Sequence, residues 1–231
     1  MKGFRTLART VLKDCSLKGF ASVDGQDEAP RTGAFVDTDL IVRAALFLSN
    51  NVVKYREVEE RSDVGRSKAY ENVKSTWDEA ARGVNGAVSI FKAAGIPSGS
   101  WIQYRYILLP PAIWIAKGHP CTDRFWLAWA VLASLWGQYS GSAETQVQAD
   151  AIHARDGSIA GLIDNLKSRA KRTESLIPDF DDFREQVVQG QGVTLGLLLH
   201  LIEVDARSFP SGKRLKQLAE PFEVHHIFPR A

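Results

Sequence analysis

Residues Tyr70–Ala94, YENVKSTWDEAARGVNGAVSIFKAA, are the stretch that decides the fold class of this chain. Their apolar residues recur at steps of three and four, which places them along one face of an α-helix. Gly95 and Pro97 follow in the order that commonly ends a helix. The spacing predicts one long amphipathic helix whose inward face comprises Tyr70, Val73, Trp77, Ala80, Val84, Ala87, Phe91 and Ala94.

The segments on either side of this stretch are also helical in character. Asp37-Thr38-Asp39 offers an N-cap to residues 40–50, and Asn50-Asn51 a stop. Residues 100–109 begin at a capping serine, and we expect Pro110-Pro111 to kink or end that segment. The aromatic segment 123–139 is apolar on most sides, which predicts that it is the central core helix.

The C-terminal part of the chain changes character. Further helices are expected at 143–155, 158–172 and 179–189, of which the first two are strongly polar. The apolar run 192–204 fits a helix or a strand, and its leucines favour a helix. Residues 222–228 alternate between two faces, as a strand does. The sequence predicts a mainly α protein: an N-terminal segment and linker (1–34), a helical-bundle domain (35–204) and a small β-containing element (205–231).

Composition narrows the possible partners and location. The formal net charge of +2 gives no bulk attraction to nucleic acid, so any such affinity needs a local patch. Cys15 and Cys121 are too few for a disulfide framework or a cysteine zinc site, and they suit a reducing compartment. The longest apolar stretch, Phe125–Gly137, is shorter than the roughly 20 residues a membrane helix needs. We therefore expect a cytoplasmic protein with no membrane partner.

Residues Glu223–Pro229, EVHHIFP, carry the clearest chemical signal. Successive side chains of a strand point to opposite faces, so His225 and His226 suit two different roles. One imidazole can bind a divalent ion, while its neighbour takes a proton from water, since its pKa of about 6.5 lies near working pH. A His-His pair alone is not specific for this chemistry, and a purely structural role stays open.

The string EVHHIFPRA resembles the first motif of the HNH endonucleases, in which a strand carries the histidine pair of a ββα-metal fold. The tail ARSFPSGKRLKQLAEPFEVHHIFPRA (206–231) and FVDTDLIVRAALFL (35–48) are similar to the C-terminal half of GmrSD-type restriction proteins. These bacterial defence proteins pair a nucleotide-dependent N-terminal domain with an HNH nuclease. The resemblance implies a metal-dependent DNA endonuclease, with an incomplete ββα-metal (HNH) element at the C-terminus.

The resemblance also implies roles for single residues. His226 takes the position of the general base that activates water, and His225 that of the ligand to Mg²⁺ or Mn²⁺. Glu223 either orients one of these histidines or is a plain solvent-facing strand residue, and Pro229 starts the turn out of the strand. Three basic residues either contact DNA phosphates or belong to a solvated turn: Lys213, Arg214 and Lys216.

The sequence departs from the family pattern at two points. That pattern continues with an asparagine and a second, metal-binding histidine, whereas this chain ends at Ala231, soon after His226. It also lacks the Asp-Gly-Gln-Gln-Arg type motif of the N-terminal domain, of which residues 24–27 are only a faint echo. These departures predict a truncated or split nuclease that binds its metal weakly and has little or no activity alone.

Two alternatives to a nuclease remain. The chain could be a non-catalytic helical module that contacts other subunits of a defence complex, or a helical scaffold whose HHIFP string is accidental.

The other three histidines are candidates for a further metal ligand. His200 is expected in the core, His153 in solvent and His119 in a turn. None of them has ligand spacing to the pair, so none is expected to complete the site.

Overall fold

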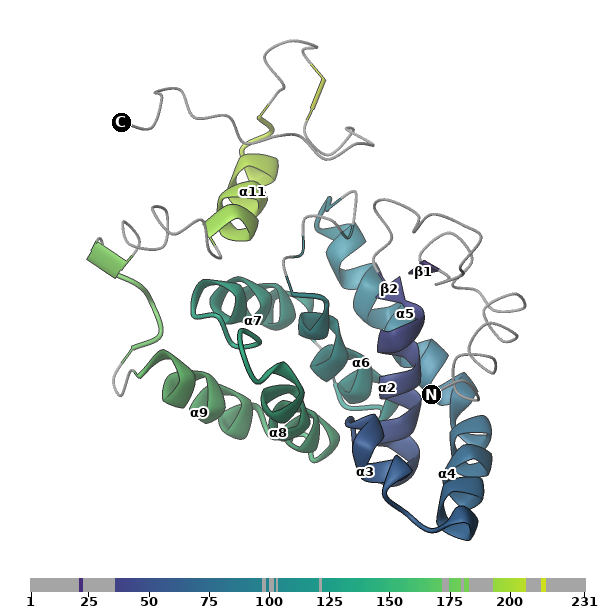
Figure 1. The fold of residues 1–231 in the computed structure, drawn as a ribbon. Coiled ribbons are helices and arrows are strands. Elements are labelled where there is room, and N and C mark those ends of the chain that lie inside the picture. Colours follow the sequence, from purple (N-terminus) through teal and green to yellow (C-terminus); the bar gives the residue numbers. More distant parts are fainter. Residues whose placement is uncertain are drawn as a thin grey trace, which may run out of the picture.

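The fold was analysed in a computed structural model, which describes residues 21–22, 36–96, 99, 102, 104–120, 122–171, 175–179, 181–182, 193–206 and 213–214. Within these residues the chain forms nine α-helices and one 3-10 helix (Figure 1). The only strands described are β1 (Ala21–Ser22) and β2 (Val36–Asp37), which pair in parallel. The predicted mainly α class is confirmed for this part. The HNH element and most of the helix expected at 179–189 lie outside it.

Helix α2 (Thr38–Asn50) begins and ends where its capping residues predict. The Asp37 carboxylate accepts a hydrogen bond of 2.8 Å from the backbone N–H of Leu40, which satisfies one of the free donors of the first turn. Asn51 adopts the left-handed conformation (φ 57°), and its N–H bonds to the Phe47 carbonyl. Between these caps, α2 is buried from Leu40 to Phe47 and forms one wall of the core.

The stretch 70–94 is two helices, so the prediction of one continuous helix is wrong at Thr76. Helix α4 (Asp63–Ser75) ends there and α5 (Trp77–Ala93) begins. The Thr76 hydroxyl lies 3.2 Å from the carbonyl of Ala45 in α2 and 3.2 Å from that of Asn72. A threonine hydroxyl that bonds nearby carbonyls favours a bend. The inward stripe survives the bend, because Val73 and Trp77 on its two sides are both buried.

Pro110 and Pro111 begin a helix rather than end one. They lie at the start of α6 (Leu109–Ala116), directly after the 3-10 helix η2 (Arg105–Leu108). The first helical positions need no backbone N–H partner, and the fixed φ of proline suits them. Our expectation missed this because it weighed proline only as a helix breaker.

Helix α6, and not the aromatic segment, lies at the centre of the core. Seven of its eight residues are buried, whereas α7 (Asp123–Leu135) is buried on one side and leaves Ala128 exposed. Helix α6 packs against α5, α2 and α8 (Figure 1). It approaches α5 most closely at Gly83, where an added Cβ would overlap the Ala112 carbonyl oxygen. A residue without a side chain is required at this contact.

The remaining helices surround this centre. Helix α3 (Tyr55–Glu59) packs on α4, and α9 (Ile159–Ala170) packs on α8 (Ala143–Arg155). Helix α11 (Val193–Glu203) lies against α7, which confirms the helical interpretation of that apolar run. The bounds of α8 match the expected range, and those of α9 nearly so. No helix of the described part is long and apolar enough to span a membrane.

Candidate functional site

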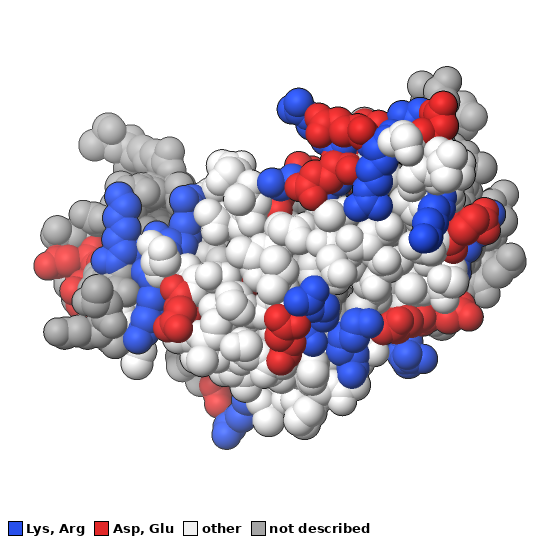
Figure 2. Space-filling view, turned by 90° about the horizontal axis from the view of Figure 1, so that it is seen from below, with Lys and Arg blue, Asp and Glu red and all other residues white. Residues whose placement is uncertain are grey.

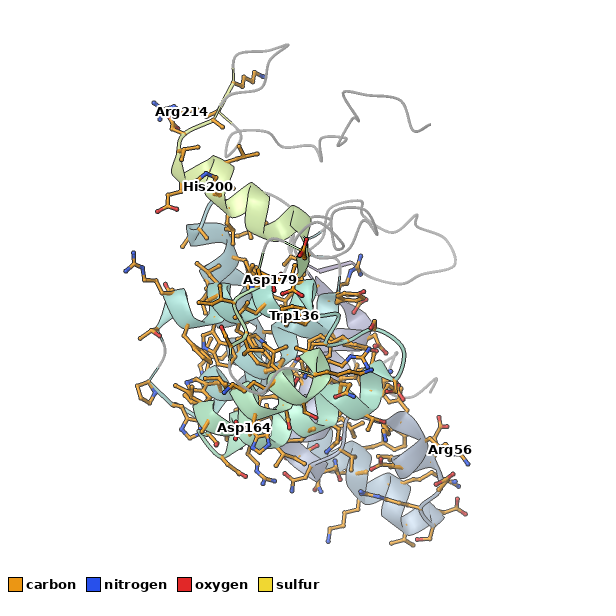
Figure 3. All side chains as sticks on the ribbon, turned by 90° about the vertical axis from the view of Figure 1, so that its left-hand side faces the viewer. Arg56, Trp136, Asp164, Asp179, His200 and Arg214 are labelled. Carbon is orange, nitrogen blue, oxygen red and sulfur yellow. The ribbon has the colours of Figure 1, made fainter. Side chains whose placement is uncertain are left out.

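The predicted histidine site lies outside the residues that the structure describes. His225 and His226 fall there, together with Glu223, Pro229 and Lys216, so their roles stay predictions. Of the basic residues predicted near phosphate, the structure places Lys213 and Arg214. The Arg214 guanidinium lies 3.2 Å from the Asp205 carboxylate, beyond the C-terminal end of α11. His200 lies near the same end of α11 (Figure 3). A phosphate would have to compete with this ion pair.

The other three histidines have separate surroundings. His119 Nε2 lies 2.8 Å from the Arg155 carbonyl oxygen, and the His119 ring packs 5.0 Å from that of Trp114. His153 is half-buried rather than solvent-exposed, and His200 is exposed rather than in the core, because α11 is only partly covered. In the described part of the chain, no three His, Cys, Asp or Glu side chains are grouped to hold a metal ion.

The most developed polar site of the described residues surrounds Arg43, which α2 carries into the core at 6% exposure. Its Nε donates to the Asp39 carboxylate at 2.6 Å, and its Nη2 lies 2.8 Å from the Glu144 carboxylate in α8. Its Nη1 donates to the Val53 carbonyl at 2.8 Å. Guanidinium is planar and carries fixed donors, which lets it serve three partners at once.

Two tyrosine rings pack against the same guanidinium. The Arg43 Cζ lies 4.5 Å from the ring centroid of Tyr55 and 5.4 Å from that of Tyr106, within the range of a cation–π contact. The Tyr55 hydroxyl donates to Asp39 Oδ1 at 2.9 Å. We call these five residues the Arg43 cluster: Arg43, Asp39, Glu144, Tyr55 and Tyr106.

Burial and charge act together on the ionisation of this cluster. Burial alone would lower the pKa of Arg43, but the Asp39 carboxylate outweighs it, and the pKa is raised. Burial raises the pKa of Tyr106 to about 12, and burial with the neighbouring Asp39 raises that of Tyr55 further. The guanidinium is therefore charged and both phenols are neutral near neutral pH.

A hollow of about 230 Å³ opens beside the Arg43 cluster, at the start of α2. Arg105 and Asp37 form an ion pair in its wall, with Nη1 2.9 Å from Oδ2. We call it the tyrosine hollow, because three tyrosines stand in its lining: Asp37, Asp39, Leu40, Tyr104, Arg105, Tyr106, Tyr139 and Ala143.

Behind the tyrosine hollow lies a buried carboxylate, Asp150 of α8. Its Oδ2 accepts hydrogen bonds from the Tyr139 hydroxyl at 2.8 Å and from Gln138 Nε2 at 2.9 Å. Its Oδ1 accepts from Asn165 Nδ2 of α9 at 3.0 Å. Burial raises the pKa of Asp150, while these three donors oppose that shift. The network fixes Tyr139 and ties the wall of the hollow to both helices.

Our sequence reading missed both polar networks, although each left a signal. Arg43 is the one charge within the apolar run of 40–48, and it stands four residues after Asp39, at ion-pair spacing on a helix. Asp150 stands three residues after Val147 and four before Ala154, on the buried stripe of α8. A charged residue on an apolar face signals a buried ion that must have partners.

Chemically, the Arg43 cluster and the tyrosine hollow bring carboxylates, guanidiniums and aromatic rings together at the start of α2. Comparison with known proteins adds no relative: no protein-family model, no curated protein and no solved structure matches the chain.

Proposed function

We propose that this chain is the helical body, with the first active-site strand, of an HNH-type metal-dependent DNA endonuclease in a bacterial restriction or defence system. One observation carries the proposal: the string EVHHIFP at 223–229, which places two histidines and a closing proline as the HNH motif does. The mainly helical body supports it only as a compatible setting. A cytoplasmic location belongs to the same proposal.

In this proposal the two histidines divide the chemistry. His226 is the general base, whose neutral imidazole takes a proton from the attacking water. His225 is a ligand of the divalent ion, which would supply charge stabilisation to the scissile phosphate. A single imidazole suits Mn²⁺ better than Mg²⁺, which prefers oxygen ligands. One protein ligand does not fix the geometry of an ion, so we expect weak binding and little or no cleavage by residues 1–231 alone.

DNA is the proposed substrate, and local positive charge would have to bind it. Figure 2 shows one face of the molecule, on which Lys and Arg alternate with Asp and Glu around an uncharged area. A face of mixed sign attracts a phosphate backbone weakly. The basic segment that begins at Lys213-Arg214 is therefore the proposed DNA contact, and Arg214 would exchange Asp205 for a phosphate.

Metal binding by the histidine pair can be tested on this chain directly. We expect that titration with Mn²⁺ broadens the imidazole NMR signals of His225 and His226 before that of exposed His200, since a paramagnetic ion broadens the nuclei nearest to it. His225→Ala should abolish the broadening at His226, and the matched control His200→Ala should leave it unchanged. Equal broadening of all five histidines, or broadening that survives His225→Ala, would contradict the proposed ligand and favour a non-catalytic helical module.

A further inference from the structure

We propose that the tyrosine hollow binds a small organic cation, an alkylammonium or alkylguanidinium group. The proposal is independent of the nuclease function, because it concerns the helical body alone. Its site is formed by the start of α2, the segment Tyr104–Tyr106 and the turn that carries Tyr139.

The protein itself shows which group such surroundings hold. In the adjoining Arg43 cluster, a guanidinium lies against two tyrosine rings and between two carboxylates. The tyrosine hollow shares two of these residues, Asp39 and Tyr106, in its wall. An occupant of the hollow would therefore lie beside the same carboxylate and aromatic ring that already hold a cation.

The other lining residues repeat this chemistry. Tyr104 and Tyr139 add two aromatic side chains, and the negative face of an aromatic ring attracts a cation. Asp37 adds a second carboxylate, 24% exposed. The volume of about 230 Å³ is below the range of roughly 300–1,000 Å³ that is usual for ligand pockets. This favours a single small ligand or the head of one long side chain.

The balance of fixed charge also favours a cation. Three carboxylates, Asp37, Asp39 and Glu144, stand against two guanidiniums, Arg43 and Arg105, so at least one negative charge is in excess, without counting Asp150 behind the hollow. The positive end of the α2 dipole, which would otherwise attract an anion, is capped by Asp37 and lies beside Asp39. A monovalent cation lowers this negative excess, whereas an anion would increase it.

Arg105 controls how much of the negative charge a ligand can reach. It is 42% exposed, and within the described residues its guanidinium forms an ion pair with Asp37. An exposed ion pair is worth only about 0–1 kcal/mol. Arg105 can therefore move into solvent with only a small loss of free energy, and the Asp37 carboxylate is then open to an incoming cation.

Two variants of this ion pair should shift affinity in opposite directions. We expect Arg105→Ala to tighten binding of n-butylammonium and n-butylguanidinium about threefold, because it removes the competing cation. Asp37→Asn should weaken binding by a similar factor, and asparagine caps a helix as well as aspartate does, so α2 is preserved. Calorimetric titration of the full chain measures both, with Glu60→Gln as a control in the exposed Arg56–Glu60 pair.

Sodium butyrate, of similar length and opposite charge, completes the test. Saturable binding of the two cations and none of butyrate, with opposite shifts in the two variants and no shift in Glu60→Gln, is the expected result. If a capped arginine tripeptide binds more tightly than butylguanidinium, the occupant of the hollow is a side chain of a protein partner. If the tripeptide binds more weakly, the occupant is a free amine. Absence of cation binding, equal binding of butyrate, or equal affinities in Asp37→Asn and Arg105→Ala would overturn the proposal.

Discussion

Gly83→Ala is expected to lower the free energy of unfolding by about 3 kcal/mol, the larger end of what overpacking a core commonly costs. The new methyl group would overlap the Ala112 carbonyl oxygen and lie 2.9 Å from the Ala116 Cβ. The first is a backbone atom of α6 and the second is a Cβ atom, so no side-chain rotation relieves the clash. Helices α5 and α6 must therefore separate. The gain in helix propensity, about 1 kcal/mol, offsets only part of the loss.

Gly86→Ala, one turn further along α5, is the matched control. Its methyl group would meet only the Ile115 side chain, at 2.9 and 3.0 Å, and that side chain is half-buried, so it has room on its solvent side for a change of rotamer. We expect a loss of at most about 1 kcal/mol, because a small rearrangement relieves this contact. Urea denaturation measures both variants. Equal stabilities would show that α5 and α6 do not meet at Gly83 as described.

Arg43→Met is the second large effect, with an expected loss of about 2–3 kcal/mol. Breaking a buried ion pair costs roughly 3–5 kcal/mol, and the partly exposed carboxylates of Asp39 and Glu144 reduce that figure through solvent screening. Methionine replaces only the aliphatic stem of the side chain and removes the guanidinium donor from both carboxylates and from the Val53 carbonyl oxygen, while Asp39 keeps the Tyr55 hydroxyl. Thermal and urea unfolding at low salt measure the loss.

Arg43→Lys separates the effect of the charge at this position from that of its hydrogen-bond geometry, and Arg56→Met is the control in an exposed ion pair. Arg43→Lys restores the charge but cannot serve three partners in one plane, so it should recover about half of the lost stability. Arg56→Met removes an arginine that is 87% exposed and paired with Glu60, and it should leave the urea and thermal midpoints unchanged within error. An Arg43→Met protein as stable as Arg56→Met would contradict the cluster as we describe it.

Local chemistry predicted much of the helical body. The Asp37 cap and the Asn51 stop follow from side chains that act within a few residues of themselves, and the bounds of α8 match the expected range. The errors at Thr76 and at Pro110 have a different origin. Thr76 bends the chain because its hydroxyl reaches Ala45 on another helix, and no periodicity along the sequence contains that contact.

Contacts between distant residues also prevented a prediction of the Arg43 cluster from the sequence. Arg43 and Glu144 are a hundred positions apart, and the sequence alone does not say that α2 and α8 bring them together. The histidine pair is the reverse case, since its interpretation rests entirely on a short string of neighbours. Local pattern therefore predicts the nuclease chemistry, and only tertiary packing reveals the polar networks of the body.

Cleavage of supercoiled plasmid in Mg²⁺ or Mn²⁺ tests the central claim, that Glu223–Pro229 begins an HNH active site, most directly. The comparison needs this chain, a form extended through the reading frame beyond codon 231, and His226→Ala in each. We expect little or no cleavage by residues 1–231, cleavage by the extended form, and its loss in His226→Ala. Cleavage that survives His226→Ala, or an extended frame without the Asn- and His-bearing helix, would contradict it.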